Sequence, residues 1–349
     1  MTDTSLRRAA RRLPRPRRFL DNAHGLYHLL LGSTLLLLIL GVVMVLSASS
    51  ILSLQQFGSA YTIAERQALF AAIGLVAMVI SLRLPEQAWR RAALPVLIGS
   101  IGLLIAVLIP GIGVEVNGQR NWIDIFGPFR IQPSEFAKFA LVLWAAHLLA
   151  RREGRLDSWK ALLMPLLPVA GLLIGLVLLE GDFGNVVMLV AILMGILFVA
   201  GAPMRLFALL GGIVALGVVG LTVIAPHRMS RFSVWLDPQS DALGNGWQLI
   251  QGQYALGTGG IWGVGLGASR EKWGALPEAH TDFIFPVVGE ELGLVGTVTL
   301  LVLFAGIAVA ILRLATISTR FYVRLAAAGV GSWLIVQAVI NIGAVLGLL

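Results

Sequence analysis

The sequence predicts an all-α, polytopic membrane protein with one long loop outside the membrane. Hydrophobic residues make up 58% of the 349 residues, charged residues make up only 13%, and the mean hydropathy is +0.88. A soluble domain of this length carries far more charge. Apolar stretches of roughly 16 to 25 residues recur along the chain, and each can cross about 30 Å of hydrocarbon as a helix.

Nine apolar stretches are expected to span the membrane. In chain order they cover Leu29–Leu46, Gln67–Leu82, Ala92–Ile112, Glu135–Ala150, Leu162–Leu179, Val186–Ala202, Leu206–Ala225, Phe283–Leu312 and Val323–Leu349. Residues 1–25 are rich in Arg and Pro, which predicts a disordered basic tail. The connection that follows the seventh stretch is the longest, and it predicts a large loop over residues 226–282.

The basic residues predict how the chain is oriented. Eighteen of the 26 Lys and Arg residues lie in the N-terminal segment and in alternate connections, seven lie in the other connections, and Lys138 falls inside a span. Cytoplasmic loops carry the excess of positive charge, so the N-terminus and the 18 residues are expected in the cytoplasm. The long basic leader and the lack of a small-residue cleavage site predict a retained first span rather than a signal peptide.

Composition excludes several classes of function. Cysteine is absent, so neither a disulfide nor a thiolate metal site can form. The net charge of +8 lies in short loops beside spans, which favours topology control and contact with anionic membrane lipids over nucleic-acid binding. The cytoplasmic connections are too short to fold as an ATPase or kinase domain.

The long loop contains a predicted amphipathic segment and a glycine-rich segment. The amphipathic segment is expected around Trp247–Leu256, and the glycines follow over Gly257–Gly267. Glycine allows backbone to approach backbone or a ligand closely. No strand before the glycines supports a nucleotide fingerprint, so close packing of interfacial helices is favoured over a phosphate-binding loop.

An acidic side chain stands where the long loop meets the eighth predicted span. Asp282 follows His280 in the sequence AHTDF. Ionisable groups at this depth are expensive and are usually kept for function. A carboxylate that is reachable from outside yet partly desolvated can act as a general base. Alternatively, Asp282 caps the helix that begins at Phe283.

A second pair of charges lies in the fourth predicted span. Glu135 and Lys138 are three residues apart and therefore share one helix face, where they are expected to pair. A structural ion pair and a functional pair are equally good interpretations. The segment Gln132 to Ser134 just before them suits the first turn of a helix. Upstream, Arg120 beside Trp122 offers either an anion-binding fork or an interfacial anchor.

Metal and nucleophile motifs are missing from the sequence. Glu290 and Glu291, about two turns beyond Asp282, are expected to be packing partners or a second acidic group. Carboxylate oxygens can bind a hard cation, but no ligand-spacing motif predicts a dedicated metal cage. The sequence contains no Gly-x-Ser-x-Gly, HExxH or Cys–His arrangement.

Four segments together resemble one family. They are GVVMVLSASS (Gly41–Ser50), RNWIDIFGPFRIQPSEFAKFALVLWAA (Arg120–Ala146), EGDFGNVVML (Glu180–Leu189) and the long stretch Asn245–Gly296, which includes KWGALPEAHTDF. The sequence is identified on these motifs as a member of the SEDS family of membrane glycosyltransferases, whose best-known branches are FtsW and RodA. The resemblance covers nearly the whole chain, and it implies a SEDS transmembrane domain over residues 26–349.

The resemblance implies a peptidoglycan glycosyltransferase that polymerises lipid II into glycan strands at the outer face of the bacterial cytoplasmic membrane. It implies that Asp282 is the catalytic residue. Residues expected to bind substrate are Arg120, Trp122, Gln132, Glu135, Lys138, His280 and Thr281. No built-in cofactor is expected, although a divalent cation, magnesium or manganese, is an open alternative. The implied partners are a class B penicillin-binding protein and other divisome membrane proteins.

Two details qualify the resemblance. Family members usually have a tenth span, whereas this chain ends at Leu349, and EGDFG stands where QPDLG is commoner. KWGALPEAHTDF and LSASS favour the FtsW branch, hence cell division and the septum, with RodA as the alternative. A lipid II flippase and a non-enzymatic divisome scaffold are the rival functions, and an outward catalytic carboxylate favours the enzyme.

Overall fold

The computed structural model describes residues 22–116, 118–126, 129–154, 162–212, 238–242, 244, 246–274 and 276–348. Within these ranges, five helices are long and apolar enough to cross a membrane. They are α2 (Ala23–Phe57), α3 (Thr62–Arg83), α4 (Glu86–Leu108), α12 (Ile284–Ile317) and α13 (Phe321–Val345). Three shorter helices are α5 (Pro133–Ala150), α7 (Leu166–Leu179) and α8 (Phe183–Val199). The predicted helical, polytopic class is therefore confirmed.

Eight of the nine predicted spans coincide with these helices except at their ends, whereas the seventh, Leu206–Ala225, lies mostly outside the described residues. The third helix begins at Glu86 and ends at Leu108, earlier at both ends than the predicted Ala92–Ile112. The first helix starts at Ala23, inside the predicted tail, because the Asn22 side chain accepts a hydrogen bond from the backbone N–H of His24 and caps it. Residues 1–21 and 213–225 lie outside the described residues, so the disordered tail and the count of nine spans stay predictions.

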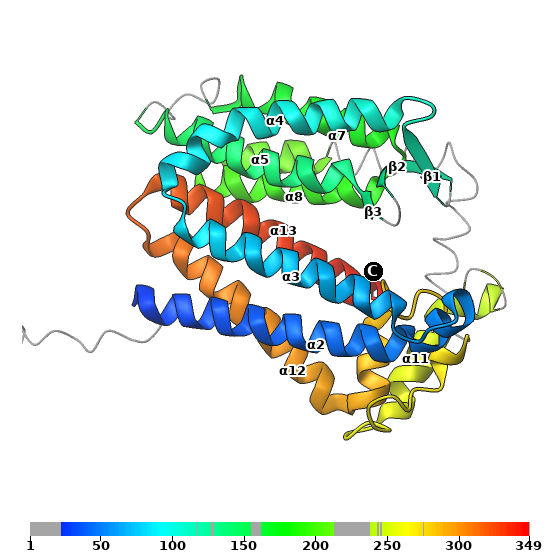
Figure 1. The fold of residues 1–349 in the computed structure, drawn as a ribbon. Helices are drawn as coiled ribbons and strands as arrows, with labels where there is room; N and C mark the ends of the chain where they lie inside the picture. The colour runs from blue at the N-terminus through cyan, green and yellow to red at the C-terminus, as the bar shows by residue number, and fades with distance from the viewer. Residues whose placement is uncertain are drawn as a thin grey trace, which may run out of the picture.

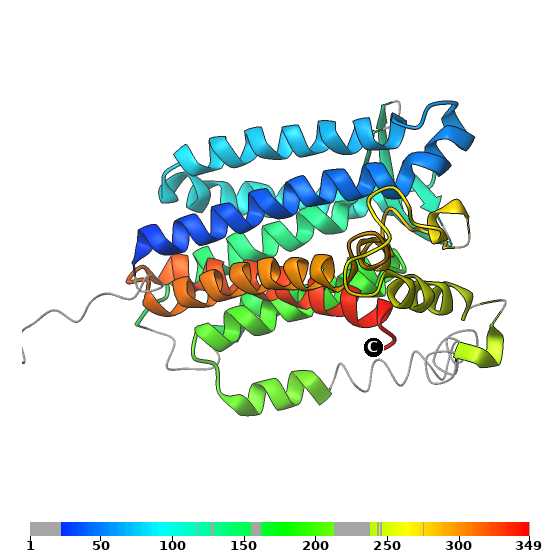
Figure 2. The same ribbon diagram turned by 90° about the horizontal axis from the view of Figure 1, so that it is seen from below.

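Helix α13 lies between two groups of helices. It packs against α5 and α8 on one side and against α12 on the other, while α2 packs on α12 and α3 on α2. Figure 1 shows α4, α5, α7 and α8 above α13, with α2 and α12 below it. In the view from below, the orange α12 and the red α13 run side by side (Figure 2).

Small residues bring the helices of the first group close together. The buried face of α5 carries Ala137, Ala140 and Ala145, each without exposed surface. A side chain at Gly195 on α8 would collide with Ser332 on α13. Helices in a membrane associate through such close packing, because lipid tails are as apolar as the side chains themselves.

A small sheet forms where the sequence predicted only a loop. Strands β1 (Gly113–Val116), β2 (Gln119–Phe126) and β3 (Phe129–Ile131) pair antiparallel in that order. Gly118, with φ of 78°, lies between the first two strands and allows the tight turn. The sheet leads directly into α5, and it lies at the same end of the helices as α11 (Trp247–Gly259), here called the loop end (Figure 1).

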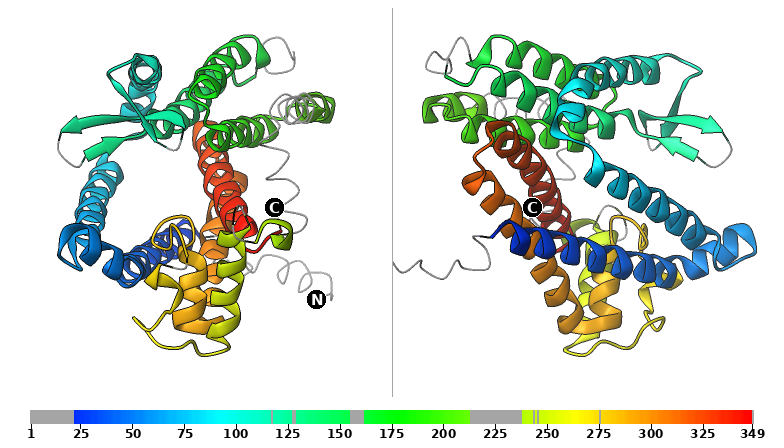
Figure 3. Two further views of the ribbon diagram at one scale, coloured as in Figure 1. Left: turned by 90° about the vertical axis from the view of Figure 1, so that its right-hand side faces the viewer. Right: turned by 60° about the vertical axis from the view of Figure 1, so that its left-hand side comes forward.

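The glycine-rich segment packs against the first part of α12. Gly259, the last residue of α11, lies so close to the Gly289 carbonyl that a side chain there would overlap it, and Gly263 is equally close to the Glu291 carbonyl. The structure thus confirms a helix in the predicted segment and close backbone packing at Gly259 and Gly263. Helix α12 is broken at Gly293, where φ is 68° and ψ is −161°. In Figure 3 the yellow loop lies against this part of the orange helix.

Candidate functional site

Asp282 lies at the loop end, immediately before α12, and is exposed on one side. On the other side it lines a cavity of about 250 Å³ together with Leu40, Met44 and Gly41 of α2. Ile284, Phe285 and Asn341 are also part of its lining. The carboxylate thus meets both solvent and an apolar wall, which is the environment that a general base needs.

The surroundings of Asp282 raise its proton affinity. Burial raises the pKa of the Asp282 carboxyl, and the negative charge of Glu278 raises it further. Glu278 was not expected from the sequence to have a role. It is the one non-glycine residue with positive φ, 53°, among the described residues, and such strained positions concentrate at functional sites.

The structure contradicts the interpretation of Asp282 as a helix cap. The residue at the N-cap position of α12 is Phe283, and no side chain caps this helix. Asp282 makes no hydrogen bond or ion pair with any part of the chain that the structure describes. Its carboxylate is therefore free to act on another molecule.

The two residues before Asp282 differ in how they are held. The Thr281 hydroxyl donates to a carboxylate oxygen of Glu278 at 2.7 Å and lines the same cavity as Asp282. His280 is partly exposed and has no hydrogen-bond partner among the described residues. Both therefore lie beside the catalytic candidate, while their predicted contact with substrate stays a prediction.

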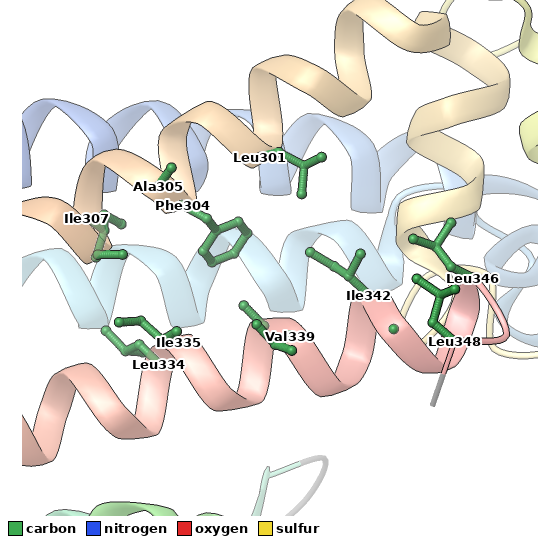
Figure 4. Close-up of a pocket in the computed structure, with 13 residues that line it drawn as sticks. Leu301, Phe304, Ala305, Ile307, Leu334, Ile335, Val339, Ile342, Leu346 and Leu348 are labelled. Atoms are coloured by element: carbon green, nitrogen blue, oxygen red, sulfur yellow. The ribbon is translucent and has the colours of Figure 1, made fainter. Parts of the chain in front are cut away.

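An apolar cavity adjoins the cavity of Asp282. It has a volume of about 520 Å³ and lies between α12 and α13, and the two cavities share Phe304, Ala338 and Ile342. Figure 4 shows its walls, which are aliphatic except for Phe304. An apolar surface therefore continues from the carboxylate into the helix bundle.

A buried ionic cluster holds the loop against α12. Glu291 accepts hydrogen bonds from the Ser47 hydroxyl of α2 at 2.7 Å and forms an ion pair with Lys272 at 3.2 Å. Lys272 also donates to the Gly267 carbonyl at 2.6 Å. Glu290 accepts from the Ser269 hydroxyl and from the Arg270 backbone N–H. The two glutamates are thus packing partners, which was one of the two roles expected for them from the sequence.

The pair in α5 forms as predicted. Lys138 Nζ lies 2.7 Å from Glu135 Oε1 and 4.9 Å from the ring centroid of Trp333 on α13. Lys138 is fully buried, whereas 43% of the Glu135 side chain is exposed. The lysine therefore ties α5 to α13, and the exposed glutamate remains accessible to a ligand.

Arg120 and Trp122 lie on β2, two residues apart, and both are partly exposed. Arg120 Nη2 is 3.9 Å from Glu115 Oε2, across β1 and β2, a long and exposed ion pair of little energetic weight. Trp122 pairs in register with Val114. The sheet thus holds both at the loop end, and among the described residues no hydrogen bond or ion pair joins either to Asp282.

Gln132 belongs to a polar cluster that the sequence did not predict. Asp182 is the N-cap of α8, accepting from the backbone N–H of Asn185 at 3.0 Å. Its other oxygen accepts from the side chains of Asn121 at 3.2 Å, Gln132 at 2.9 Å and Asn185 at 2.8 Å. Ser134 accepts a further bond from Asn185. Gln132 therefore joins the sheet, α5 and α8, and its amide is already engaged.

Glu180 lies at the edge of this cluster. Only 2% of it is exposed, and neither carboxylate oxygen has a hydrogen-bond partner. Burial first, and the charge of Asp182 second, raise the pKa of Glu180 to about 8. Within the described ranges, no group of three or more His, Asp or Glu side chains is arranged to hold a metal.

The predicted site residues thus fall into two groups at the loop end. His280, Thr281 and Asp282 precede α12, whereas Arg120, Trp122, Gln132, Glu135 and Lys138 lie on the sheet and α5. No role was expected from the sequence for Glu278, Glu180 or Asn121. All three lie inside the family-like segments, but nothing in those segments shows that Glu180 and Asn121 are buried or that the charge of Glu278 acts on Asp282.

The helices and the carboxylate at their loop end define a polytopic membrane protein with a candidate catalytic site. Residues 27–349 match the family of FtsW, RodA and SpoVE cell cycle proteins. The chain belongs to this family, the SEDS family.

Two relatives illustrate the match. The protein named "Probable peptidoglycan glycosyltransferase FtsW" of Mycobacterium tuberculosis is 42% identical over 93% of this chain and 62% of its own length. Stage V sporulation protein E of Bacillus subtilis is 39% identical over 92% of this chain and 87% of its own length. The chain therefore spans less than two thirds of the mycobacterial relative.

Solved structures share the fold. The rod shape determining protein RodA of Thermus thermophilus is 28% identical, with a TM-score of 0.63 over 92% of this chain and 84% of that chain. A chain of the structure described as "Structural coordination of polymerization and crosslinking by a peptidoglycan synthase complex" is 29% identical, with a TM-score of 0.67 over 89% of this chain and 87% of that chain.

Proposed function

We propose that this protein is a peptidoglycan glycosyltransferase that polymerises lipid II during cell division. The observation that carries the proposal is the free Asp282 carboxylate, exposed at the loop end and backed by an apolar cavity. The names of the relatives, peptidoglycan glycosyltransferase FtsW among them, support the same activity.

In this proposal Asp282 is the general base. It removes the proton from the acceptor sugar's 4-hydroxyl as that oxygen attacks the anomeric carbon of the donor, so the bond from this carbon to the pyrophosphate breaks. The displaced group is polyprenyl pyrophosphate, and a single displacement inverts the anomeric carbon. The negative charge of the departing pyrophosphate would be met by the partly exposed Arg120 or by a bound divalent cation, because Lys138 is fully buried and already paired with Glu135. The apolar cavity beside Asp282 supports a lipid-linked substrate.

The proposal includes a place and partners for the protein. The loop end faces the outside of the cytoplasmic membrane at the septum and the N-terminus lies in the cytoplasm, as the distribution of Lys and Arg supports. The partner would be a class B penicillin-binding protein that cross-links the strands, beside other divisome proteins and membrane lipids. The peptidoglycan synthase complex among the structural neighbours supports such a pairing.

Asp282→Asn is the first test. The variant keeps the size of the side chain but removes the base, so polymerisation of purified lipid II in detergent, with the class B partner present, is expected to fall by about 10²- to 10⁴-fold. Equal elution and melting of the two proteins controls for folding. Normal polymerisation by the variant would refute the catalytic assignment. If the wild-type complex makes no polymer but moves lipid II across vesicle membranes, the protein is a flippase and not a polymerase.

A further inference from the structure

The turn between α7 and α8 concentrates negative charge without a cation. Glu180 and Asp182 lie two residues apart, both are at least nine-tenths buried, and neither takes part in an ion pair within the described part of the chain. Asp182 is well supplied with N–H donors, as described above. Glu180 has none, so the two neighbouring carboxylates are in very different situations.

The position of Glu180 on its helix makes its buried negative charge still less favourable. It is the C-cap residue of α7, directly after Leu179. The last carbonyl groups of a helix carry partial negative charge, which disfavours an anion and attracts a cation. A bare carboxylate that is buried at such a position is costly, and proteins normally resolve it with a bound cation or a proton.

Asn121 provides a second oxygen without a partner. Its amide nitrogen donates to Asp182 and to Gln119, which places the side chain beside the turn. Its carbonyl oxygen Oδ1 is buried and accepts no hydrogen bond. The opposite orientation of the amide would turn its oxygen toward the Asp182 carboxylate and repel it, so the chemistry of the neighbours supports this orientation.

We propose that Glu180 and the Asn121 carbonyl oxygen bind a divalent cation, Mg²⁺ or Mn²⁺, at the turn between α7 and α8. Hard cations take carboxylate and amide oxygens as ligands, and Mg²⁺ is commonly held by one or two carboxylates with water completing its shell. Glu180 neutralises one charge of the divalent cation, and Asp182, the nearby N-cap of α8, offsets the other. The proposal does not depend on the glycosyltransferase activity, because the cation would bind without substrate.

The test is Mn²⁺ binding to the purified full chain in detergent, after treatment with EDTA, followed by electron paramagnetic resonance. Saturable binding to the wild-type protein is expected. Glu180→Gln should weaken it by more than about tenfold, since even outer-shell changes at metal sites cost about 10- to 100-fold. Glu115→Gln is the matched control, because it removes an exposed carboxylate of β1 at the same end, and it should bind as the wild type does.

Three results would overturn the proposal. The first is a wild-type protein that does not bind Mn²⁺ saturably, and the second is a Glu180→Gln variant that binds Mn²⁺ as well as the wild type does. The third is an infrared carbonyl band of a protonated carboxylic acid that persists with Mn²⁺ and vanishes in Glu180→Gln, because Glu180 would then be neutralised by a proton. Gln has the same shape as Glu and removes a buried charge, so the variant is expected to fold, and its elution profile checks this.

Discussion

The residues around Asp282 set the pKa of its carboxyl group. In the proposed role as general base, Asp282 would work only when ionised, so the rate of polymerisation should rise as the pH passes its pKa. Burial, and next the charge of Glu278, place that pKa above the value of an ordinary aspartic acid. The acid limb of the pH–rate profile should therefore lie at higher pH than an exposed aspartate would give.

Glu278→Gln should move that acid limb to lower pH. The substitution removes the repelling charge and so lowers the pKa of Asp282, while the glutamine carbonyl can still accept the Thr281 hydroxyl. The shift is partial because burial, the larger cause, remains. The measurement is kcat/KM for polymerisation against pH. Glu65→Gln, an exposed carboxylate in the first turn of α3, should leave the profile in place. An unchanged profile in Glu278→Gln would show that Glu278 does not influence the base.

The sequence predicted Asp282 itself, because a carboxylate at the mouth of an apolar segment stands out. It could not predict Glu278 as its neighbour. That contact depends on a turn in which Glu278 takes positive φ and its carbonyl accepts from the backbone N–H groups of Thr281 and Phe283. Such a turn is decided by the packing of the whole loop and not by local preference.

Helix α12 is an element interrupted for a structural reason. At Gly293 the backbone takes angles that only glycine adopts readily, and a side chain there would collide with the Gly263 amide and the Ile261 carbonyl of the loop. The break lets the first part of α12, which begins just after Asp282, receive hydrogen bonds from the loop at Glu290 and Glu291.

Gly293→Ala should therefore destabilise the protein. The backbone angles alone cost about 1–3 kcal/mol in a residue with a side chain, and the collision with the loop adds to this. Gly99→Ala is the control, since Gly99 lies in α4 with no atom within 4 Å of an added side chain, and it should stabilise by about 0.4–1 kcal/mol. Thermal unfolding in detergent measures both. Equal melting of Gly293→Ala and the wild type would contradict this role of the break.

Some element boundaries are set by local sequence signals, and others are set by contacts with distant residues. The ends of α5 follow from local signals, because Pro133 suits the first turn and charged residues follow Ala150. The sheet before α5 was missed because β1 and β3 are short and the first strand begins directly beside a predicted span. Their pairing, with bulges in both ladders, stabilises the strands.

At the scale of the whole molecule, the cluster of Ser47, Lys272 and Glu291 joins distant parts of the chain. The Ser47 hydroxyl and the Glu291 carboxylate are 244 residues apart in sequence. Lys272 and Glu291 have side chains that are 4% and 0% exposed, so each charge relies on the other. The cluster holds the loop, α2 and the start of α12 in one arrangement around the cavity of Asp282.

Lys272→Met should destabilise the molecule by about 3–5 kcal/mol, because it leaves a buried carboxylate without its cation. Adding Glu291→Gln should recover part of the loss, since the unpaired charge is then gone. Ser47→Ala is expected to cost less, about 1–3 kcal/mol, for one lost hydroxyl donor. Unfolding in detergent is measured for the wild type, the single variants Lys272→Met, Glu291→Gln and Ser47→Ala, and the double variant. A double variant whose loss equals the sum of the single losses would show that the two charges are not coupled.

The sequence by itself determined the membrane class, the positions of most helices, the Glu135–Lys138 pair and the prominence of Asp282. These features follow from composition, periodicity and separations of a few residues, which act through local structure. Only the tertiary structure decided that Glu180 lies bare at a helix end, that Asn121 and Asp182, 61 residues apart, share one cluster, and that α12 breaks at Gly293. The physical reason is that these depend on contacts between segments far apart in the chain, whose burial and charge no local pattern records.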